Sequence, residues 1–457
     1  MGQKVSVCII TRNHERFIET CLKSVKPVAY EIIIYDLGSL DKTKKIAKKY
    51  GKFFNIKFEN DYSKLKNKQT IQAKGDWILF LEPEEVLMED TQKKLLPFLE
   101  NLPQTNVPLV FQFKVFNSQP DGYPGTTFFK NTLFKNNQNI IFNGLVHEYP
   151  VCTKGELIIQ KAPFAINNFE SFKPPGEVQK KAIHNINLLI ESIEKSKDKS
   201  RNYHYFYHLG NAYCQVYDFH RALESYNKAN YLFQQLKNKP YIFYGELLVK
   251  LTGTLAFCFQ NYKDCLIFVD ELLKVSPKFL DALFLLGYCK QNMGNYNEAL
   301  KIYKNILNLS DKNSEELNPL GLTSLDTALI PLVKFNLGRT YLNLKNKEKG
   351  INFLESSYNS SPATKQTLLH LTRYYLLESN LSKALPFYLK NTSQKHHPKE
   401  IENMESTAKL PSDSPAFKEM LLKFLISMEP LDEWTELESA QIKGKIEEVR
   451  GEEEVRR

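Results

Sequence analysis

Three glutamates that lie close together in the sequence have the chemistry of a metal or phosphate site. Glu82, Glu84 and Glu85 follow an apolar run in GDWILFLEPEEVL, at positions 75–87. Residues two apart in an extended segment project to the same side, so Glu82 and Glu84 can point the same way. Two ionised carboxylates so placed repel each other unless a cation lies between them. Mg²⁺ or Mn²⁺ is typically held by one or two carboxylates plus substrate phosphates, so the stretch is a candidate site for a metal and a phosphorylated ligand.

A structural explanation fits the same acids. Glu84, Glu85, Glu89 and Asp90 stand near the start of an expected helix. Negative charge at a helix N-terminus is favoured by roughly 0.3–1 kcal/mol per residue. Judged on these residues alone, the structural explanation is favoured over a metal site.

Alternating strands and helices are expected to position these acids. Short apolar runs rich in β-branched residues predict strands at 5–10, 31–36, 53–60 and 76–82, with helices between them at 14–25, 42–50 and 64–74. This alternation predicts a mostly parallel sheet with right-handed crossovers. Ligands of such sheets bind beyond the carboxyl ends of the strands. The polar residues that follow each strand are therefore expected to converge on one crevice.

The composition argues against several classes of function. The turn after the first strand, TRNHER, has no glycine, so the phosphate turn of dinucleotide-binding enzymes is absent. The net charge of +9 is carried by lysines spread through helical segments without zinc-finger spacing or an RNA-binding motif, so nucleic acid is not expected as a partner. No apolar run is long enough to cross a bilayer. Seven scattered cysteines without a CxxC pair favour reduced thiols in the cytoplasm.

A repeat pattern begins at about residue 200. Gly210 is followed by Tyr213, Ala222, Tyr226 and Ala229 in the register of a tetratricopeptide repeat (TPR). The register returns at Gly253, Gly287 and Gly338, with Pro277 and Pro362 closing two copies, and a degenerate fifth copy contains Thr372. The step from Gly253 to Gly287 is 34 residues, the period of this class. Longer steps place insertions at about 235–243 and 311–328. Five copies in register predict a helical solenoid.

Three blocks of the first third resemble a known family. VSVCIITRNHERFIETCLKSV, EIIIYDLGSLDKTKKIAKKYG and GDWILFLEPEEVL resemble, in order and spacing, the family 2 glycosyltransferases with a GT-A fold. They look most like the branch with C-terminal TPRs, which includes enzymes that glycosylate bacteriocin peptides on cysteine. The resemblance covers roughly the first 150 residues. It implies a nucleotide-sugar donor, usually a uridine diphosphate sugar, a divalent metal (Mn²⁺ or Mg²⁺) and inversion at the anomeric carbon.

The resemblance also implies residues that bind the donor. Thr11 stands where the first strand of the family ends against the nucleoside. Asp36, in DLGSLD, stands where the family's DxGSxD aspartate meets the base. Lys66 and Asn67 stand where the family usually has Arg-Asn, so a lysine replaces an arginine.

The acids have counterparts in the family as well. Glu82 and Glu84 fall on the two aspartates of the DxD motif, which implies that Glu82 faces the ribose and metal and that Glu84 binds the metal. Glu85 matches the acid that commonly follows and is a candidate catalytic base. FNGLVHEYP, at 142–150, looks like the branch's FxGxxHE block. There, His147 is a candidate metal or diphosphate contact, and Glu148 is a second candidate base.

These observations predict an α/β N-terminal GT-A domain, a Rossmann-like wound sheet, over residues 1–172. An all-α TPR solenoid is expected over 178–395, and a polar C-terminal segment over 396–457. Residues 170–178, ESFKPPGEV, are the expected hinge. A helix at about 417–426 is expected to cap the array, and the charged C-terminal end is expected to be a frayed helix or disordered.

The expected function is transfer of a sugar from a nucleotide-sugar donor to a peptide or protein. The concave surface of a solenoid can grip such an acceptor, or a second protomer in a homodimer. Two alternatives stay open. The chain could be a catalytically impaired relative that serves as a TPR scaffold, or a transferase that acts on a glycan acceptor.

Overall fold

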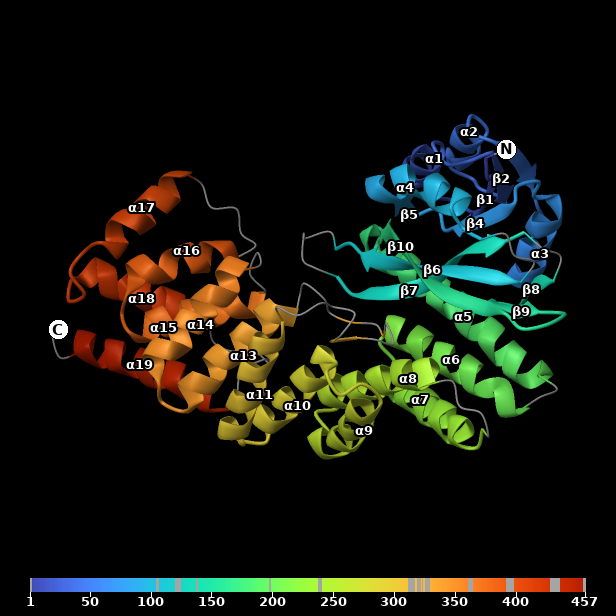
Figure 1. The fold of residues 1–457 in the computed structure, drawn as a ribbon. Coiled ribbons are helices and arrows are strands. Elements are labelled where there is room, and N and C mark those ends of the chain that lie inside the picture. The colour runs from blue at the N-terminus through green and yellow to red at the C-terminus, as the bar shows by residue number, and fades with distance from the viewer. Residues whose placement is uncertain are drawn as a thin grey trace. The chain divides into compact units, whose positions relative to one another are not determined.

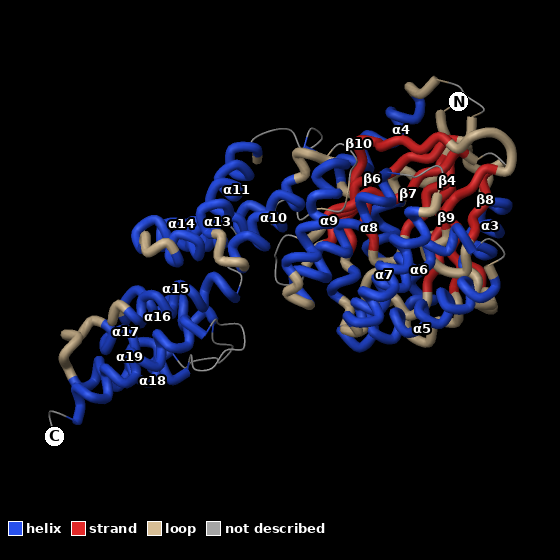
Figure 2. Tube along the Cα trace, turned by 90° about the horizontal axis from the view of Figure 1, so that it is seen from below, coloured by secondary structure: helices blue, strands red, loops and turns tan. Residues whose placement is uncertain are grey.

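The computed structural model describes residues 2–103, 107–119, 125–136, 139–196, 199–236, 241–310, 317–318, 322, 324, 329–360, 365–391, 398–427 and 436–454. The chain divides into two compact units, Met1–Gly294 with Asn308–Leu329, and Asn295–Leu307 with Ile330–Arg457. The named strands of the described residues all belong to the first unit, and the second unit is helical there (Figure 2).

Eight of the described strands form one mixed sheet in the first unit, in the order β3–β2–β1–β4–β7–β6–β10–β5 (Figure 1). As the sequence predicts, β1 pairs in parallel with β2 and β4, and β2 pairs in parallel with β3. Beyond β4 the sheet becomes mixed, because β7 is antiparallel to β4 and β6, and β5 is antiparallel to β10. A separate hairpin joins β8 and β9. The strands are β1 (Val5–Thr11), β2 (Glu31–Asp36), β3 (Lys52–Asn55), β4 (Trp77–Leu81), β5 (Glu85–Leu87), β6 (Leu109–Asn117), β7 (Thr127–Lys135), β8 (Ile140–Asn143), β9 (Tyr149–Cys152) and β10 (Ile158–Asn168).

Alternate residues of β1 pack into different cores on the two faces of the sheet. Val5, Val7 and Ile9 lie in a core with side chains of α1 (Ile18–Val25) and α4 (Glu89–Glu100). Cys8 lies in a second core with side chains of α3 (Tyr62–Gln72) and β8. The short α2 (Thr43–Ala47) follows β2. Burial on both faces explains why this strand is an almost continuous apolar run.

Helix α5 (Pro175–Lys195) joins the sheet region to the first repeats. It begins at Pro175, where a missing backbone N–H costs nothing because the first turn has no partner for it. Its Leu188 and Leu189 share a core with Val146, from the loop between β8 and β9, and with side chains of α6 (Tyr203–Gln215). The expected hinge at 170–178 holds a 3₁₀ helix, Glu170–Phe172, and the start of α5, and it lies inside the first compact unit.

Helix pairs occur at each predicted repeat in the described part of the chain, which confirms the solenoid prediction. At Gly210, an added Cβ would lie 2.4 Å from the ring of Tyr226, and at Gly338 it would lie 2.7 Å from Leu354, so both glycines allow two helices to approach closely. Gly253 has open space around it and lacks this role. After α6 and the preceding 3₁₀ helix Lys199–Asn202 come α7 (Phe219–Gln234), α8 (Tyr241–Gly253), a π-helical turn (Thr254–Cys258), α9 (Tyr262–Val275), α10 (Leu280–Asn292), α11 (Tyr296–Leu309), α13 (Leu329–Asn343), α14 (Lys347–Ser360), α15 (Lys365–Leu377) and α16 (Leu381–Asn391).

Three further helices, α17 (Pro398–Ala408), α18 (Pro415–Ser427) and α19 (Glu436–Glu454), complete the second unit. The helix predicted at 417–426 is present as α18. The charged end forms α19, whose Ile442, Ile446 and Val449 are buried in a core with Phe424. Their spacing of four and three residues places them on one helix face, so this end is a packed helix.

Some of the segments singled out from the sequence are not described by the structure. Pro362, part of 235–243 and most of 311–328 lie outside the described residues. Where the structure describes the chain, no helix combines the length and apolar character needed to span a bilayer.

Candidate functional site

A cleft of about 550 Å³ lies in the first unit, where β1 and β4 end. Of the residues singled out from the sequence, Thr11, Lys66, Glu82, Glu84 and Glu148 line it. This is the edge of the sheet at which a wound α/β fold binds its ligands. The remaining predicted residues are not among those that line it, and their contacts explain why.

The acidic stretch is a tight turn. The N–H of Glu85 donates to the carbonyl of Glu82 at 3.0 Å, with Pro83 at the second position, where its fixed φ suits a turn. Glu85 then begins β5. The extended geometry expected for Glu82 and Glu84 is therefore wrong. The structural explanation, in which these acids stand at the start of a helix, is also wrong for Glu84 and Glu85, because α4 begins only at Glu89.

Glu85 holds this turn in place. Lys130 Nζ, on β7, donates to both carboxylate oxygens of Glu85, at 2.7 and 2.8 Å. The Oε2 atom also accepts the N–H of Glu82 at 2.8 Å. Glu82 itself is 46% exposed, and its Oε1 lies 3.8 Å from Lys130 Nζ. Glu85 is therefore buried and fully bonded, whereas Glu82 is open to the cleft.

Glu84 lies beside two positive groups although its side chain is only 3% exposed. Its Oε1 lies 2.6 Å from Lys173 Nζ and 3.7 Å from Lys181 Nζ. Burial alone would raise the pKa of Glu84, but the charges of Lys181 and Lys173 outweigh it and lower the pKa to about 2. Glu84 is therefore ionised at neutral pH and neutralised by the chain's own ammonium groups.

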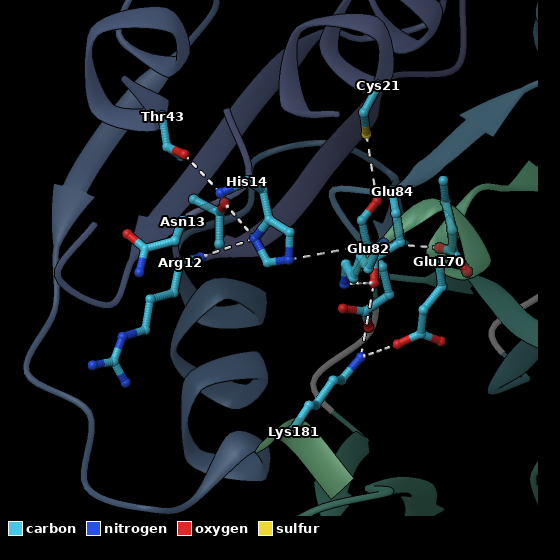
Figure 3. A network of polar contacts seen from close by, with 12 residues as sticks. Arg12, Asn13, His14, Cys21, Thr43, Glu82, Glu84, Glu170 and Lys181 are labelled. Carbon is cyan, nitrogen blue, oxygen red and sulfur yellow. Dashed lines mark hydrogen bonds and ion pairs between the residues drawn. The ribbon is translucent and has the colours of Figure 1, made fainter. Parts of the chain in front are cut away.

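His14 faces the other oxygen of Glu84. The N–H of Arg12 donates to His14 Nδ1 at 3.2 Å, so the proton of the neutral ring belongs on Nε2. That Nε2 lies 3.6 Å from Glu84 Oε2 (Figure 3). The pKa of His14 is lowered, chiefly by burial. Nothing in the sequence pattern pointed to His14 as part of the acidic site.

The FxGxxHE-like block divides between two environments. Glu148 Oε1 lies 2.5 Å from Lys66 Nζ, and the ammonium of Lys66 also stands over the ring of Phe80 at 5.2 Å. The ring of His147 instead stacks on His208 of α6 at 4.0 Å, with a backbone φ of +51°. The structure thus brings Glu148 into the cleft and turns His147 towards the helices.

Asp36 and Asn67 stabilise neighbouring backbone. Asp36 Oδ2 accepts the N–H groups of Gly38 and Ser39 at 3.2 and 3.0 Å, and Gly38 adopts a φ of +86° that suits glycine. The Asn67 amide donates to the carbonyl of Phe142 at 3.0 Å and accepts its N–H at 2.8 Å. Asp36 therefore shapes the loop after β2, and Asn67 attaches β8 to α3.

Glu84 and Glu85 do not fit the divalent cation that the resemblance implies, whereas Glu82 is open to the cleft. Such a cation needs convergent oxygen ligands at about 2 Å. Glu84 and Glu85 are each already paired with an ammonium group, and a cation at Glu84 would stand beside both Lys173 and Lys181. Among the residues that the structure describes, no group of three or more His, Cys, Asp or Glu side chains is placed to hold a metal.

Comparisons with known proteins agree with the resemblance found in the sequence. Residues 6–155 match the family model for glycosyl transferase family 2, and residues 281–311 and 333–364 match models of the tetratricopeptide repeat. A glycosyltransferase-like domain followed by TPRs is therefore confirmed.

Three curated relatives are similar to parts of the chain. A TPR repeat-containing protein of Synechococcus elongatus is 32% identical over 146 residues, 32% of this chain and 35% of that protein. The SPbeta prophage-derived glycosyltransferase SunS of Bacillus subtilis is 26% identical over 284 residues, 60% of this chain and 63% of that protein. An uncharacterized glycosyltransferase of Rickettsia bellii is 36% identical over 95 residues, 21% of this chain and 32% of that protein. The chain thus spans less than two thirds of the length of each relative.

Proposed function

We propose that the chain is a glycosyltransferase that binds a nucleotide-sugar donor, of the uridine diphosphate class, in the cleft of the first unit. One observation carries the proposal: the residues that match the family 2 model, 6–155, include those that end β1 and β4 at the cleft. The cleft's volume of about 550 Å³ lies within the usual range of about 300–1,000 Å³ for small-molecule sites.

Glu148 is the proposed base that takes the proton from the acceptor. It is one of two candidate bases, and it borders the cleft, whereas Glu85 is buried under Lys130. A base must come within hydrogen-bonding reach of the proton that it removes. Lys66, paired with Glu148 at 2.5 Å, orients that carboxylate before the acceptor arrives. We assign Glu85 a positioning role, since it fixes the turn that carries Glu82 and Glu84.

The acceptor is proposed to be a peptide or protein held by the TPR helices, with inversion at the sugar carbon. Solenoids of this class present long concave surfaces suited to extended peptides, which is an argument from fold. A homodimer through the repeats is the alternative use of that surface. The seven cysteines are all free thiols, which supports our placement of the activity in the cytoplasm. Because Glu84 and Glu85 are paired with ammonium groups, no step is assigned to a divalent cation.

The proposal is tested by incubating the full chain with a panel of sugar nucleotides and measuring release of the nucleoside diphosphate. We expect slow hydrolysis of one donor, and at least a tenfold loss in Glu148→Gln, since general bases contribute roughly 10²–10⁴-fold. The exposed Glu156→Gln, in the same region, is the matched control and should change nothing.

A scaffold without catalysis is the second candidate, because Glu84, which corresponds to the second acid of the DxD motif, is paired with Lys173. It predicts that no donor in the panel is consumed. Turnover that does not depend on Glu148 would keep the enzyme and remove this residue as its base.

A further inference from the structure

The acids of the cleft are neutralised by lysines that come from distant parts of the chain. Lys130 pairs with Glu85 from β7, and Lys173 pairs with Glu84 from the residue before Pro174, at the start of α5. Lys181, eight residues after Lys173 and within α5, lies 3.7 Å from Glu84 and 2.6 Å from Glu170. Lys173 and Lys181 both contact Oε1 of Glu84, so a cation bound at that oxygen would stand beside two ammonium groups.

The charges that border the cleft favour an anion over a cation. Among the described residues that line it, five are basic: Arg12, Lys66, Lys173, Lys180 and Lys181. Four are acidic: Glu82, Glu84, Glu148 and Glu177. The formal balance is five minus four, or +1, before a ligand enters. A divalent cation would raise the local charge to +3, whereas a diphosphate would bring the local charge to a small negative value.

Lys181 is the group best placed to reach an incoming ligand. Lys173 is only 7% exposed and is held by Glu84, whereas Lys181 is 48% exposed and contacts the same oxygen of Glu84 at the longer distance of 3.7 Å. Figure 3 shows Lys181 extending from α5 towards Glu84 and Glu170. Its ammonium group can exchange a carboxylate partner for a phosphate oxygen without leaving a buried charge unpaired.

We propose that the diphosphate of the donor is bound in this cleft by lysine ammonium groups, with Lys181 as the principal contact, in place of a divalent cation. This inference rests on the proposed function and names how its site holds the donor. Lysine is a compact point charge that commonly binds phosphate. The lysines thereby neutralise the charge that grows on the leaving nucleoside diphosphate, which the family's metal would otherwise do.

The test is calorimetric titration of the full chain with uridine diphosphate and guanosine diphosphate, in EDTA and then with Mn²⁺. We expect binding in EDTA with an affinity within about twofold of that in Mn²⁺. Lys181→Gln should weaken binding roughly 10- to 100-fold, the usual effect of losing a hydrogen bond to a charged group. Lys181→Arg keeps the charge and should retain most of the affinity.

The matched control is Lys195→Gln on the same helix, where an exposed lysine pairs with Glu191. It should bind as the wild type does, and circular dichroism should report the same helix content for all three variants.

Binding that requires Mn²⁺ would overturn the lysine proposal and leave the proposed function intact. Unchanged affinity in Lys181→Gln would also overturn it. If neither nucleotide binds under either condition, the proposed function is overturned as well. Because the comparison of EDTA with Mn²⁺ uses the wild-type chain, it decides the question even if a variant folds poorly.

Discussion

Replacing Glu84 with glutamine is expected to destabilise the first unit strongly, because it leaves a buried ammonium group without its anion. Glu84 Oε1 and Lys173 Nζ are 2.6 Å apart, and the two side chains are 3% and 7% exposed. Removing one partner of a buried ion pair typically costs about 3–5 kcal/mol. The expected loss in the free energy of unfolding at pH 7 is therefore about 3 kcal/mol or more.

The pH dependence of folding stability gives a second value for the loss in the free energy of unfolding. The pKa of Glu84 is lowered from 4.5 to about 2, although burial alone would raise it, because the charges of Lys181 and Lys173 outweigh the burial. The gap between 4.5 and about 2 corresponds to roughly 3 kcal/mol of folding free energy. A lowered pKa in the folded state contributes stability that is complete above pH 4.5 and is lost as the pH falls towards 2. The difference between wild type and Glu84→Gln should therefore shrink over this window.

Urea unfolding followed by tryptophan fluorescence measures this effect. The chain has two tryptophans, so a Trp434→Phe background leaves the buried Trp77 of β4 as the reporter for the first unit. Glu89→Gln is the control, because its exposed carboxylate pairs with the exposed Lys93, and such pairs contribute about 0–1 kcal/mol. A loss below about 1 kcal/mol at pH 7, or a difference that stays constant down to pH 3, would refute the reasoning.

Three further substitutions test local features. Gly38→Ala should cost roughly 1–2 kcal/mol, because the φ of +86° is strained for any residue with a Cβ, and a thermal melt would detect it. Gly210→Ala places a Cβ 2.4 Å from the ring of Tyr226 and should destabilise the first repeat by about 1–3 kcal/mol. Gly253→Ala, which meets open space, should be neutral or stabilising. Hydrogen exchange of the repeats distinguishes the two variants, and equal effects would contradict the packing argument. Asn67→Ala removes two hydrogen bonds to backbone and should cost about 1–3 kcal/mol in urea unfolding, while an unchanged midpoint would show that the contact is dispensable.

The parallel half of the sheet could be predicted from the sequence because its signals are local. The strand predicted at 31–36 is exact, β1 extends one residue beyond its predicted end, and β4 is one residue shorter than predicted at each end. Apolar β-branched runs mark strands that are buried on both faces, and they need no knowledge of distant residues. The repeats could also be predicted, because the step of 34 residues from Gly253 to Gly287 is the period of the class, and Gly210 and Gly338 mark close helix contacts.

The partners of the acids could not be predicted, because they come from far along the chain. Glu84 and Lys173 are 89 residues apart, and Glu85 and Lys130 are 45 apart. No spacing rule connects such positions until the sheet and α5 have formed. The turn at Glu82 was misjudged for a different reason: Pro83 fits both an extended segment and the second position of a turn.

The packed C-terminal helix was missed although its signal was present. Ile442, Ile446 and Val449 have helical spacing, but the charged residues around them concealed it. A narrow apolar stripe on a charged helix is enough to dock it against a neighbouring core.

A crystal structure of the full chain soaked with uridine diphosphate in EDTA tests the central claim most directly. The account predicts electron density in the cleft, with the diphosphate in hydrogen-bonding contact with Lys181 and the nucleoside beside Thr11. A cleft that stays empty at saturating nucleotide, or a nucleotide bound elsewhere on the chain, would contradict it.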